Sequence, residues 1–317
     1  MVTLEEVKKA QLGNKDFVHY TPILTSAQLD DLCGNRVFLK AEHLQKTGSF
    51  KIRGAANKVQ QAVKEGAKYI TAASSGNHGQ AVAYMANKLG VPATIVVPED
   101  ANPVKIAAIE AYNGKIVKCG TTSAERIPKA MEIAEQNDGV FIPPYDDPYI
   151  IAGQGTLGIE ILEQVPNAEI IVVPVGGGGL ISGILTAVKQ LNPMIKVIGV
   201  EPDTANDTFL SLQTGEITAI PATSTIADGL RTSQPGDLTF PILKEYLDDL
   251  VLVSEGEIRD ALHFIVERTK QVIEPSSAVT IAAILSEKLD VEGKHIVAVL
   301  SGGNVDLRQM DEFLSMK

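Results

Sequence analysis

The sequence predicts an α/β protein with two three-layer α/β/α domains whose sheets are mostly parallel. Strand-like and helix-like segments alternate from residue 69 to 142 and again from residue 155 to 300. Because consecutive parallel strands need a crossover connection, usually a helix, this alternation indicates parallel sheets with helices on both faces. A chain of 317 residues that is 44% apolar is also long enough to form more than one core.

The first alternating stretch predicts a small domain at residues 69–146. Short β-branched segments are each followed by a segment of helical periodicity. The predicted strands are 69–72, 93–98, 115–118 and 140–142, and the predicted helices are 80–89, 103–112 and 123–137. The proline-rich segment 143–148 predicts a linker, because proline interrupts helices and strands alike.

The remaining residues, 1–68 and 147–317, predict a large domain into which the small one is inserted. Thr3 and Glu6 have the spacing of a capping box and predict a helix at 3–12. The other predicted helices are 27–32, 54–65, 155–165, 180–191, 255–269 and 276–288, and the predicted strands are 36–40, 169–175, 196–200, 249–253 and 295–300. The intervening residues 201–248 predict a long irregular segment.

Composition excludes several classes of function. The net charge of −11 and the absence of Trp argue against a nucleic-acid partner, which needs clustered cations and stacking rings. No apolar run reaches the ~20 residues of a membrane span, and the charged N-terminus has no apolar signal core. Cys33 and Cys119 have no metal-ligand spacing and are interpreted as reduced thiols. We therefore expect a soluble, cytoplasmic protein.

The stretch Thr47–Gly54 places a lysine, Lys51, directly after an aromatic residue and among small residues. A dry pocket lowers the pKa of an amine and frees it to act as a nucleophile or to form a Schiff base. A basic helix N-terminus with ordinary loop glycines explains this octapeptide alone equally well.

Three loops follow predicted strands, where open α/β sheets bind ligands. The tetraglycine loop Gly176–Gly179 joins a buried strand to a helix, so its N–H groups and the helix dipole suit an anion. Its spacing is neither that of a Walker loop nor that of a dinucleotide fingerprint. The loops 74–78 and 301–304 have the same placement, and hydroxyl, amide and helix N-terminal N–H groups suit a carboxylate. Flexible connectors and capping turns are the alternative interpretation.

Taken together, these segments resemble the fold type II pyridoxal-phosphate enzymes, and more closely the serine/threonine dehydratase and serine racemase family. The resemblance covers essentially the whole chain. Its motifs SFKIRGA, SSGNHGQ, PPYDDP, AGQGT, GGGGL, EP, ADG and SGGN occur in family order. The resemblance implies the tryptophan synthase β-like fold and pyridoxal 5′-phosphate as cofactor.

The resemblance also implies roles for residues that would hold the cofactor. Lys51 is similar to the Schiff-base lysine, Phe50 to the residue packed beside the ring, and Asn77 to the partner of the phenolic oxygen. Gly176, Gly177, Gly178 and Gly179 resemble the phosphate loop, and Ser301 the partner of the pyridine nitrogen. A hydroxyl there does not hold a proton on the ring as an aspartate would, so we expect prompt β-elimination to be favoured over transamination.

Further residues are expected near the substrate or cofactor by the same resemblance. The residues implied to receive the substrate carboxylate are Ser74, Ser75, Asn77 and His78. Arg126 matches an arginine near the substrate in relatives, and Glu274 an acidic residue near the cofactor. Gly229 and Thr232 lie in a segment that often contacts substrate.

Ser75 distinguishes two activities. Many threonine dehydratases that resemble this chain have alanine at this position, whereas serine racemases have serine. Racemisation needs a second acid/base on the opposite face of the planar carbanion, which Ser75 could supply. Binding of a carboxylate by its hydroxyl explains the residue equally well.

The segment 201–207 predicts a metal site. Two carboxylates with an intervening carbonyl suit a hard cation, and racemase-like relatives bind Mg²⁺ or Ca²⁺ through residues that match Glu201, the Ala205 carbonyl and Asp207. We expect Mg²⁺, Ca²⁺ or Mn²⁺ here, and a solvated acidic loop is the alternative.

The leading prediction is a pyridoxal-phosphate-dependent serine/threonine dehydratase of the racemase-like, metal-binding subgroup. It would convert L-serine and L-threonine to pyruvate and 2-oxobutyrate plus ammonia, and Lys51 would remove the Cα proton. The alternatives are a serine racemase with side elimination and a threo-3-hydroxyaspartate ammonia-lyase. A nucleotide-binding or sensory α/β protein is the alternative from another class. The expected partners are a small hydroxy-amino acid and a second copy in a homodimer.

Overall fold

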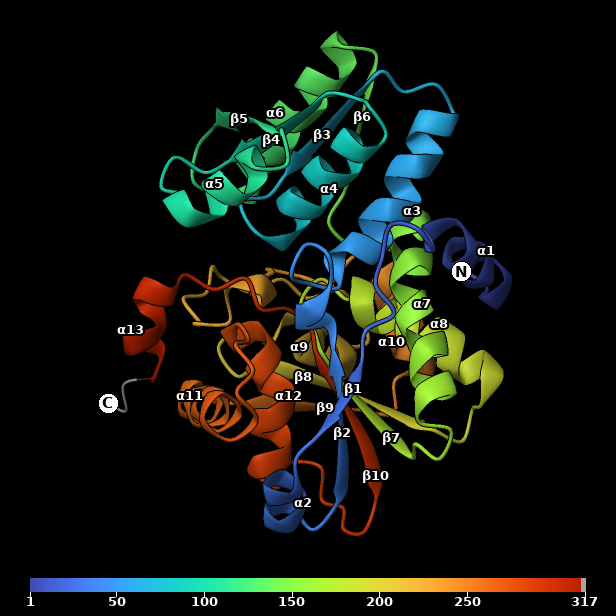
Figure 1. The fold of residues 1–317 in the computed structure, drawn as a ribbon, viewed down its shortest axis with the longest axis vertical. Helices are drawn as coiled ribbons and strands as arrows, with labels where there is room; N and C mark the ends of the chain where they lie inside the picture. The colour runs from blue at the N-terminus through green and yellow to red at the C-terminus, as the bar shows by residue number, and fades with distance from the viewer. Residues whose placement is uncertain (315–317) are drawn as a thin grey trace.

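The computed structural model describes residues 1–314 and is organised around two separate sheets (Figure 1). The smaller sheet lies at the top of the view and the larger one below it. The smaller has four strands in the order β5-β4-β3-β6, and the larger has six in the order β1-β2-β10-β7-β8-β9. All neighbouring pairs are parallel except β1–β2, which confirms the predicted α/β class with mostly parallel sheets.

The smaller sheet is built from the first alternating stretch of the sequence. Its strands are β3 (Tyr69–Ala73), β4 (Ala93–Val97), β5 (Lys115–Lys118) and β6 (Gly139–Phe141). Its helices are α4 (Asn77–Lys88), α5 (Pro103–Glu110) and α6 (Ser123–Gln136). Helix α3 (Lys51–Lys64) adds Ile52, Ala55 and Val59 to the apolar core of this sheet, although it precedes the predicted small domain.

The larger sheet gathers strands from both ends of the chain. They are β1 (Ile23–Thr25), β2 (Arg36–Ala41), β7 (Ile170–Pro174), β8 (Lys196–Pro202), β9 (Asp249–Val253) and β10 (His295–Leu300). The accompanying helices are α1 (Leu4–Asn14), α2 (Ala27–Cys33), α7 (Pro148–Gln164), α8 (Gly179–Leu191), α9 (Asp207–Thr214), α10 (Thr239–Tyr246), α11 (Glu255–Phe264), α12 (Pro275–Leu285) and α13 (Met310–Leu314). Thr3 and Glu6 form the predicted capping box of α1.

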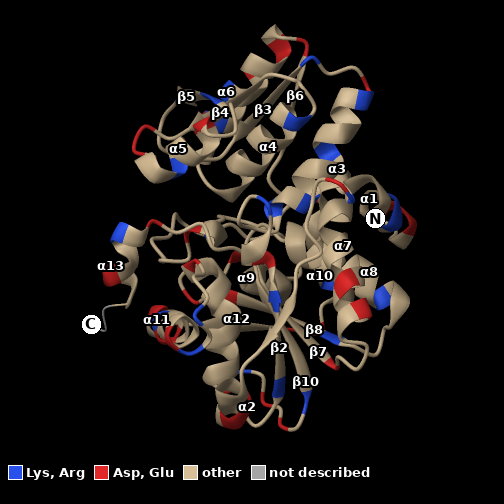
Figure 2. Ribbon diagram, viewed as in Figure 1, with Lys and Arg blue, Asp and Glu red and all other residues tan. Residues whose placement is uncertain are grey.

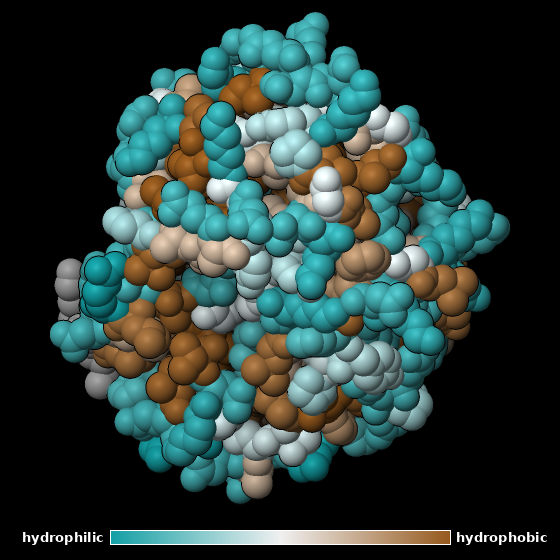
Figure 3. Space-filling view, turned by 45° about the horizontal axis from the view of Figure 1, so that its top comes forward, coloured by the Kyte–Doolittle hydropathy of each residue, from teal (hydrophilic) through white to brown (hydrophobic). Residues whose placement is uncertain are grey.

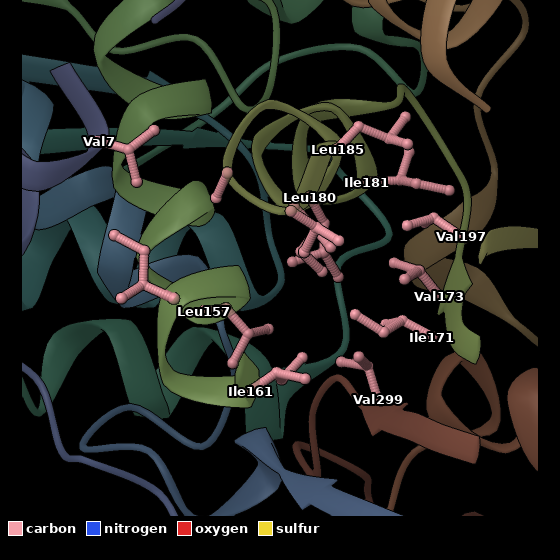
Figure 4. Packing of buried hydrophobic residues seen from close by; sticks show 14 of the residues in the cluster. Val7, Leu157, Ile161, Ile171, Val173, Leu180, Ile181, Leu185, Val197 and Val299 are labelled. Atoms are coloured by element: carbon pink, nitrogen blue, oxygen red, sulfur yellow. The ribbon is translucent and has the colours of Figure 1, made fainter. Parts of the chain in front are cut away.

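Two apolar clusters cover the two faces of the larger sheet. Figure 4 shows Leu157 and Ile161 of α7 and Leu180, Ile181 and Leu185 of α8 directed towards side chains of β7, β8 and β10. The opposite face is covered by side chains of α2, α11 and α12. Because both faces are buried, β7 reads as a continuous apolar run with no exposed residue. The result is a three-layer α/β/α arrangement.

Glycines allow helices α3, α7 and α8 to approach each other closely. A Cβ on Gly153 would lie 2.5 Å from the Arg53 carbonyl oxygen, and one on Gly183 would lie 2.5 Å from the Gly155 nitrogen. Helix α7 begins at Pro148, with Asp147 as its N-cap, and not at residue 155 as predicted. Its glycines lower intrinsic helix propensity but are required by packing.

Other element boundaries also differ from the prediction. Helix α3 begins at Lys51, three residues earlier than expected. The segment 201–248 was predicted to be irregular and instead contains the eight-residue helices α9 and α10. Short helices such as these are held by packing, and they give little periodic signal in the sequence.

The surface is mixed in charge and polarity. Lys and Arg are interspersed with Asp and Glu over the elements drawn in Figure 2. On the face in Figure 3, apolar patches alternate with hydrophilic side chains. Within residues 1–314, no helix combines the length and the apolar character needed to cross a membrane.

Candidate active site

The candidate site lies where the strand order of the larger sheet reverses. After β7 the chain proceeds outward to β8 and β9 and then returns to β10 on the other side of β7. The carboxyl ends of β7 and β10 therefore flank the crevice in which open α/β sheets bind ligands. The tetraglycine loop follows β7 and Ser301 follows β10, as predicted.

The lysine loop and the loop after β10 are hydrogen-bonded to each other, although some 250 residues separate them. The Phe50 backbone N–H donates to the Ser301 carbonyl at 3.0 Å, and the Gly303 N–H donates to the Gly48 carbonyl at 2.8 Å. These bonds fix Lys51, at the first turn of α3, beside Ser301.

Lys51 lines a pocket of about 280 Å³ between the two sheets. Its Nζ donates to the Pro144 carbonyl at 2.8 Å and has no ion pair within residues 1–314. Burial lowers the pKa of Lys51 to about 8, and Glu274 opposes this shift. An ordinary lysine at neutral pH is almost entirely protonated, so this amine is unusually available as a base or nucleophile.

The tetraglycine loop is formed of residues that cannot carry side chains in this conformation. A Cβ on Gly177 would lie 2.4 Å from the Tyr145 ring, and Gly178 has a φ of +87°. The Thr239 hydroxyl donates to the Gly177 carbonyl at 2.8 Å and so braces the loop. Helix α8 begins at Gly179, which directs the N–H groups of its first turn at the pocket and favours an anion there.

The loop after β3 presents polar groups from the other side. Asn77, at the first position of α4, donates from Nδ2 to Glu274 at 2.8 and 3.1 Å. His78 is buried, and its Nε2 lies 2.9 Å from the Ile142 carbonyl. Burial and the nearby Lys51 lower the pKa of His78 to about 3, so it is neutral at physiological pH. The Ser75 hydroxyl has no hydrogen-bond partner among the described residues.

Glu274 is the one acidic side chain of the predicted set that lines this pocket. Burial, with a smaller contribution from Asp228, raises the pKa of Glu274 to about 7. Ser301 is also buried, and its hydroxyl lies 3.1 Å from that of Ser277. Ser277 in turn bonds both the N–H and the carbonyl of Gly302 at 2.7 Å, which holds the loop after β10 against α12.

Arg126 carries two unsatisfied donors. Its Nη2 donates to the Ser123 hydroxyl at 3.2 Å, while the buried Nε and Nη1 atoms have no partner within residues 1–314. A partly desolvated guanidinium with free donors that lines a pocket suits an anionic ligand.

The structure brings all the predicted cofactor and substrate residues to this one pocket. They are Phe50, Lys51, Ser74, Ser75, Asn77, His78, Arg126, Gly176–Gly179, Gly229, Thr232, Glu274 and Ser301. Sequence reasoning assigned no role to Tyr145 or Asp228, which also line it, although both lie in quoted motifs. Lys105 had no signal in the sequence; it reaches the pocket from α5 and pairs with Asp228.

The predicted metal residues form a separate, adjoining group. Glu201, Ala205 and Asp207 are fully buried. Glu201 accepts from the N–H groups of Thr208 and Phe209 at 3.1 and 2.9 Å, and Asp207 accepts from the hydroxyl of Thr232 at 3.3 Å. Thr232 also lines the main pocket, so it connects the two sites.

No cation compensates these two carboxylates within residues 1–314. Burial, assisted by Asp207, raises the pKa of Glu201 to about 8, and burial raises the pKa of Asp207 to about 7. Across the described residues, no three His, Cys, Asp or Glu side chains converge as a metal-ligating group. A metal here would rely on two carboxylates, a backbone carbonyl and water.

Comparison with known proteins decides the family. The model of the family described as "Pyridoxal-phosphate dependent enzyme" matches residues 15–302. The chain belongs to this pyridoxal-phosphate-dependent family. It is 45% identical over 316 residues to the L-threonine ammonia-lyase of Thermotoga maritima, which covers 99% of this chain and 79% of the relative.

A second relative has a different activity at the same identity. The serine racemase of Dictyostelium discoideum is 45% identical over 321 residues, which covers 99% of this chain and 98% of the relative. The structure of maize serine racemase aligns with a TM-score of 0.94 at 38% identity, over 98% of this chain and 96% of that one. The predicted threonine dehydratase and serine racemase family and its tryptophan synthase β-like fold are confirmed.

The pocket fits the cofactor of this family. An aldehyde requires an amine with a lowered pKa, and Lys51 has one. A phosphate requires converging N–H groups with no side chains in the way, and Gly176–Gly179 supply them. Phe50 and Ser301 line the same pocket. This pyridoxal-phosphate-dependent enzyme acts on an amino acid, as its relatives do.

Proposed function

We propose that the protein is a pyridoxal-phosphate-dependent serine/threonine dehydratase that converts L-serine or L-threonine to the 2-keto acid and ammonia. One observation carries the proposal: the Lys51 amine lies in a pocket between the tetraglycine loop and the loop after β3. The cofactor, when bound, withdraws electrons from the substrate and stabilises a carbanion at its Cα.

Two groups of residues would place the substrate. The hydroxyls of Ser74 and Ser75 and the N-terminal N–H groups of α4 suit the α-carboxylate. The free donors of Arg126 add positive charge on the same side of the pocket. Gly229 and Thr232 form part of the opposite wall, where the Gly229 N–H donates to the Ser276 hydroxyl at 2.9 Å.

Lys51 would then move the proton. A neutral Nζ accepts the Cα proton, and its pKa of about 8 keeps a substantial neutral fraction at physiological pH. The β-hydroxyl on the adjacent carbon takes up a proton from an acidic group in the pocket and leaves as water. The Ser301 hydroxyl would bind the ring nitrogen of the cofactor, which would favour this elimination over transamination. Exchange of Ser301 for Asp should therefore change the ratio of products; an unchanged ratio would count against this role.

We also propose a Mg²⁺, Ca²⁺ or Mn²⁺ ion at Glu201, the Ala205 carbonyl and Asp207. The support is the burial of two neighbouring carboxylates with no cation to compensate them. Because Thr232 bonds Asp207 and lines the main pocket, an ion there would order that pocket wall. The role would be structural and would not include direct contact with the reacting atoms.

Serine racemisation is the second candidate, and Ser75 favours it. Its hydroxyl lines the pocket without a protein partner among the described residues, as an acid/base needs. Exchange of Ser75 for Ala should lower racemisation and leave or raise elimination. Equal loss of both activities would instead indicate a role in substrate binding.

The decisive experiment incubates the purified protein with L-serine, D-serine, L-threonine and 3-hydroxyaspartate and follows keto acid and enantiomer together. The dehydratase proposal expects keto acid from L-serine and L-threonine, and no product with the Lys51→Ala variant. D-serine formed from L-serine without keto acid would establish the racemase instead. Turnover of 3-hydroxyaspartate alone would establish the third activity of the family.

Three organisational statements remain predictions. The proposed limits of the small domain are residues 69–146; the strands of the smaller sheet lie within them, and α3, which packs against helices of both sheets, lies outside them. A homodimer and a cytoplasmic location are expected by resemblance, and light scattering of the purified protein would test the first of these.

A further inference from the structure

A closed set of hydrogen bonds connects the side chains of Asn77, Asn304 and Glu274. Asn304 Nδ2 donates to the Thr47 carbonyl at 2.7 Å and to Asn77 Oδ1 at 2.8 Å. Asn77 Nδ2 donates to Glu274 at 2.8 and 3.1 Å. The Asn304 backbone also hydrogen bonds the Glu274 carboxylate. Asn304, Asn77 and Glu274 therefore form a ring of contacts that spans three segments of the chain.

The two ends of this set determine how both side-chain amides point. The Thr47 carbonyl accepts hydrogen bonds and cannot donate them, and Glu274 accepts from the Asn77 side chain and from the Asn304 backbone. Asn304 must therefore turn its Nδ2 towards Thr47, and Asn77 must turn its Nδ2 towards Glu274. The remaining contact, Asn304 Nδ2 to Asn77 Oδ1, is consistent only with these orientations. If either side-chain amide were flipped, two acceptors or two donors would face each other across one of these contacts.

The loop around Asn304 is built to hold this side chain in place. Gly48 has a φ of +74°, and a Cβ there would lie 2.3 Å from Asn304 Oδ1. The Gly303 N–H donates to the Gly48 carbonyl at 2.8 Å. The glycine at position 48 therefore makes room for Asn304, and its left-handed conformation is one that glycine adopts at low energetic expense.

We propose that Asn304 is a positioning residue that fixes the Asn77 amide with its N–H donors towards Glu274 and the pocket. The inference rests on the proposed function and on the predicted role of Asn77, by resemblance, as the partner of the cofactor's phenolic oxygen. One carboxylate, Glu274, is the partner of Asn77 Nδ2 within residues 1–314, so a second hydrogen of that NH₂ group is available to a ligand oxygen. A reversed amide would present a lone pair to that anion and weaken its binding.

The first test measures the dissociation constant of pyridoxal 5′-phosphate by titration of the full-length apoprotein, followed by absorbance. Asn304→Asp keeps the shape of the side chain and removes its donors, so Asn77 is expected to turn its Nδ2 to the new carboxylate. We expect the dissociation constant to rise about 10- to 100-fold, because a hydrogen bond to a charged group is replaced by repulsion.

Asn35→Asp is the matched control. Asn35 is buried and its Nδ2 also donates to two backbone carbonyls, those of Cys33 and Val291, at 2.7 and 3.1 Å. It lies outside the pocket. Both variants should lower the melting temperature, but the control should change the dissociation constant less than about twofold. An Asn304→Asp variant within twofold of the parent, or a control with the same loss, would overturn the proposal.

The second test asks whether the orientation itself matters. In the double variant Asn304→Asp with Glu274→Gln, Asn77 can donate to position 304 and accept from position 274, so the two hydrogen bonds of Asn77 are restored in the reversed direction, while the Thr47 carbonyl still lacks its donor. We expect the double variant to melt higher than the sum of the two single effects predicts, while the cofactor remains weakly bound. Strict additivity of melting temperatures, or full recovery of cofactor affinity, would contradict the proposal.

Failure of this inference is distinguishable from failure of the proposed function. A parent protein that shows no absorbance change with pyridoxal 5′-phosphate contradicts the proposed function. A parent that binds the cofactor and an Asn304→Asp variant that binds it equally well contradicts only the role of Asn304.

Discussion

Two lysines of this protein, Lys40 and Lys51, differ in how their amines are paired. Lys40 is fully buried, and its Nζ donates to the Thr21 carbonyl, Glu160 and Gln164 at 2.7–2.8 Å, which uses all three hydrogens. Lys51 lines a cavity, and among the described residues its Nζ donates one hydrogen bond, to the Pro144 carbonyl, and lies 5.2 Å from the centre of the Phe50 ring. Burial lowers the pKa of both amines. Burial therefore does not distinguish the two lysines, whereas the number of hydrogen bonds that each amine makes does.

The same contrast holds for buried carboxylates. Arg53, which is fully buried, bonds both Glu42 and Glu160 at 2.7–2.9 Å, so together with Lys40 the cluster contains two cations and two anions. Glu201 and Asp207 are equally buried, and no cation within residues 1–314 pairs with them. A buried charge that is fully paired holds helices to the sheet, whereas one left without a partner marks a place for a ligand.

The largest expected effect separates the two lysines. Lys51→Ala should abolish turnover, a loss of at least about 10³-fold, because both the covalent anchor and the proton acceptor are removed. Lys40→Met should destabilise the fold but retain turnover at temperatures where the protein is folded. Steady-state rates of both variants measure this. Turnover by Lys51→Ala at the rate of the parent protein would contradict a catalytic role that Lys51 has and Lys40 lacks.

The second effect concerns the paired cluster. Arg53→Met leaves Glu42 and Glu160 buried without their guanidinium, so we expect the free energy of unfolding to fall by about 3–5 kcal/mol. Lys68→Met is the control, since Lys68 pairs with Asp138 at the surface and an exposed pair contributes about 0–1 kcal/mol. Urea denaturation measures the free energy of unfolding of both variants. Equal decreases would show that the buried ion pairs of the cluster stabilise the fold no more than a surface pair does.

The third effect concerns the unpaired carboxylates. Addition of Mg²⁺ at 100 times its dissociation constant should raise the free energy of unfolding by about 2.7 kcal/mol, and EDTA should reverse this. The gain should vanish in Asp207→Asn and persist in Asp203→Asn, because Asp203 is exposed in the same loop. A melting temperature indifferent to EDTA, Mg²⁺, Ca²⁺ and Mn²⁺ would discard the ion.

The fourth effect is a pH dependence of the metal-free protein. The pKa values of Glu201 and Asp207 rise on folding from 4.5 and 3.8 to about 8 and about 7. The folded state therefore holds more protons than the unfolded state across this range, and stability falls as pH rises from about 4 to about 8. The slope should be at most about 1.4 kcal/mol per pH unit for each proton held.

Denaturation in EDTA at pH 5.5, 7 and 8.5 measures this slope. The Asp207→Asn variant should reduce it, and added Mg²⁺ should flatten it because the ion replaces the protons. A metal-free protein that gains stability between pH 5.5 and 8.5 would contradict the account of these carboxylates.

The sequence predicted the site better than the helix boundaries, and the reason is local. The loops at residues 74, 176 and 301 each follow an apolar strand, so their common location follows from sheet topology alone. The start of α7 at Pro148 could not be predicted in this way. Gly153 and Gly155 are unfavourable for a helix in sequence, and only the packing of α3 and α8 against them shows why glycine is needed there. The role of Asn304 also required the structure, since its partners Thr47 and Asn77 are more than 200 residues away.

The central claim is that the Lys51 amine, left with one hydrogen-bond partner, carries pyridoxal 5′-phosphate. Reduction of the holoprotein with borohydride, followed by proteolysis and peptide mass mapping, tests it most directly. We predict a phosphopyridoxyl mass increase on the peptide that contains Lys51 and an unmodified peptide that contains Lys40. No adduct, or an adduct on a lysine other than Lys51, would contradict the account.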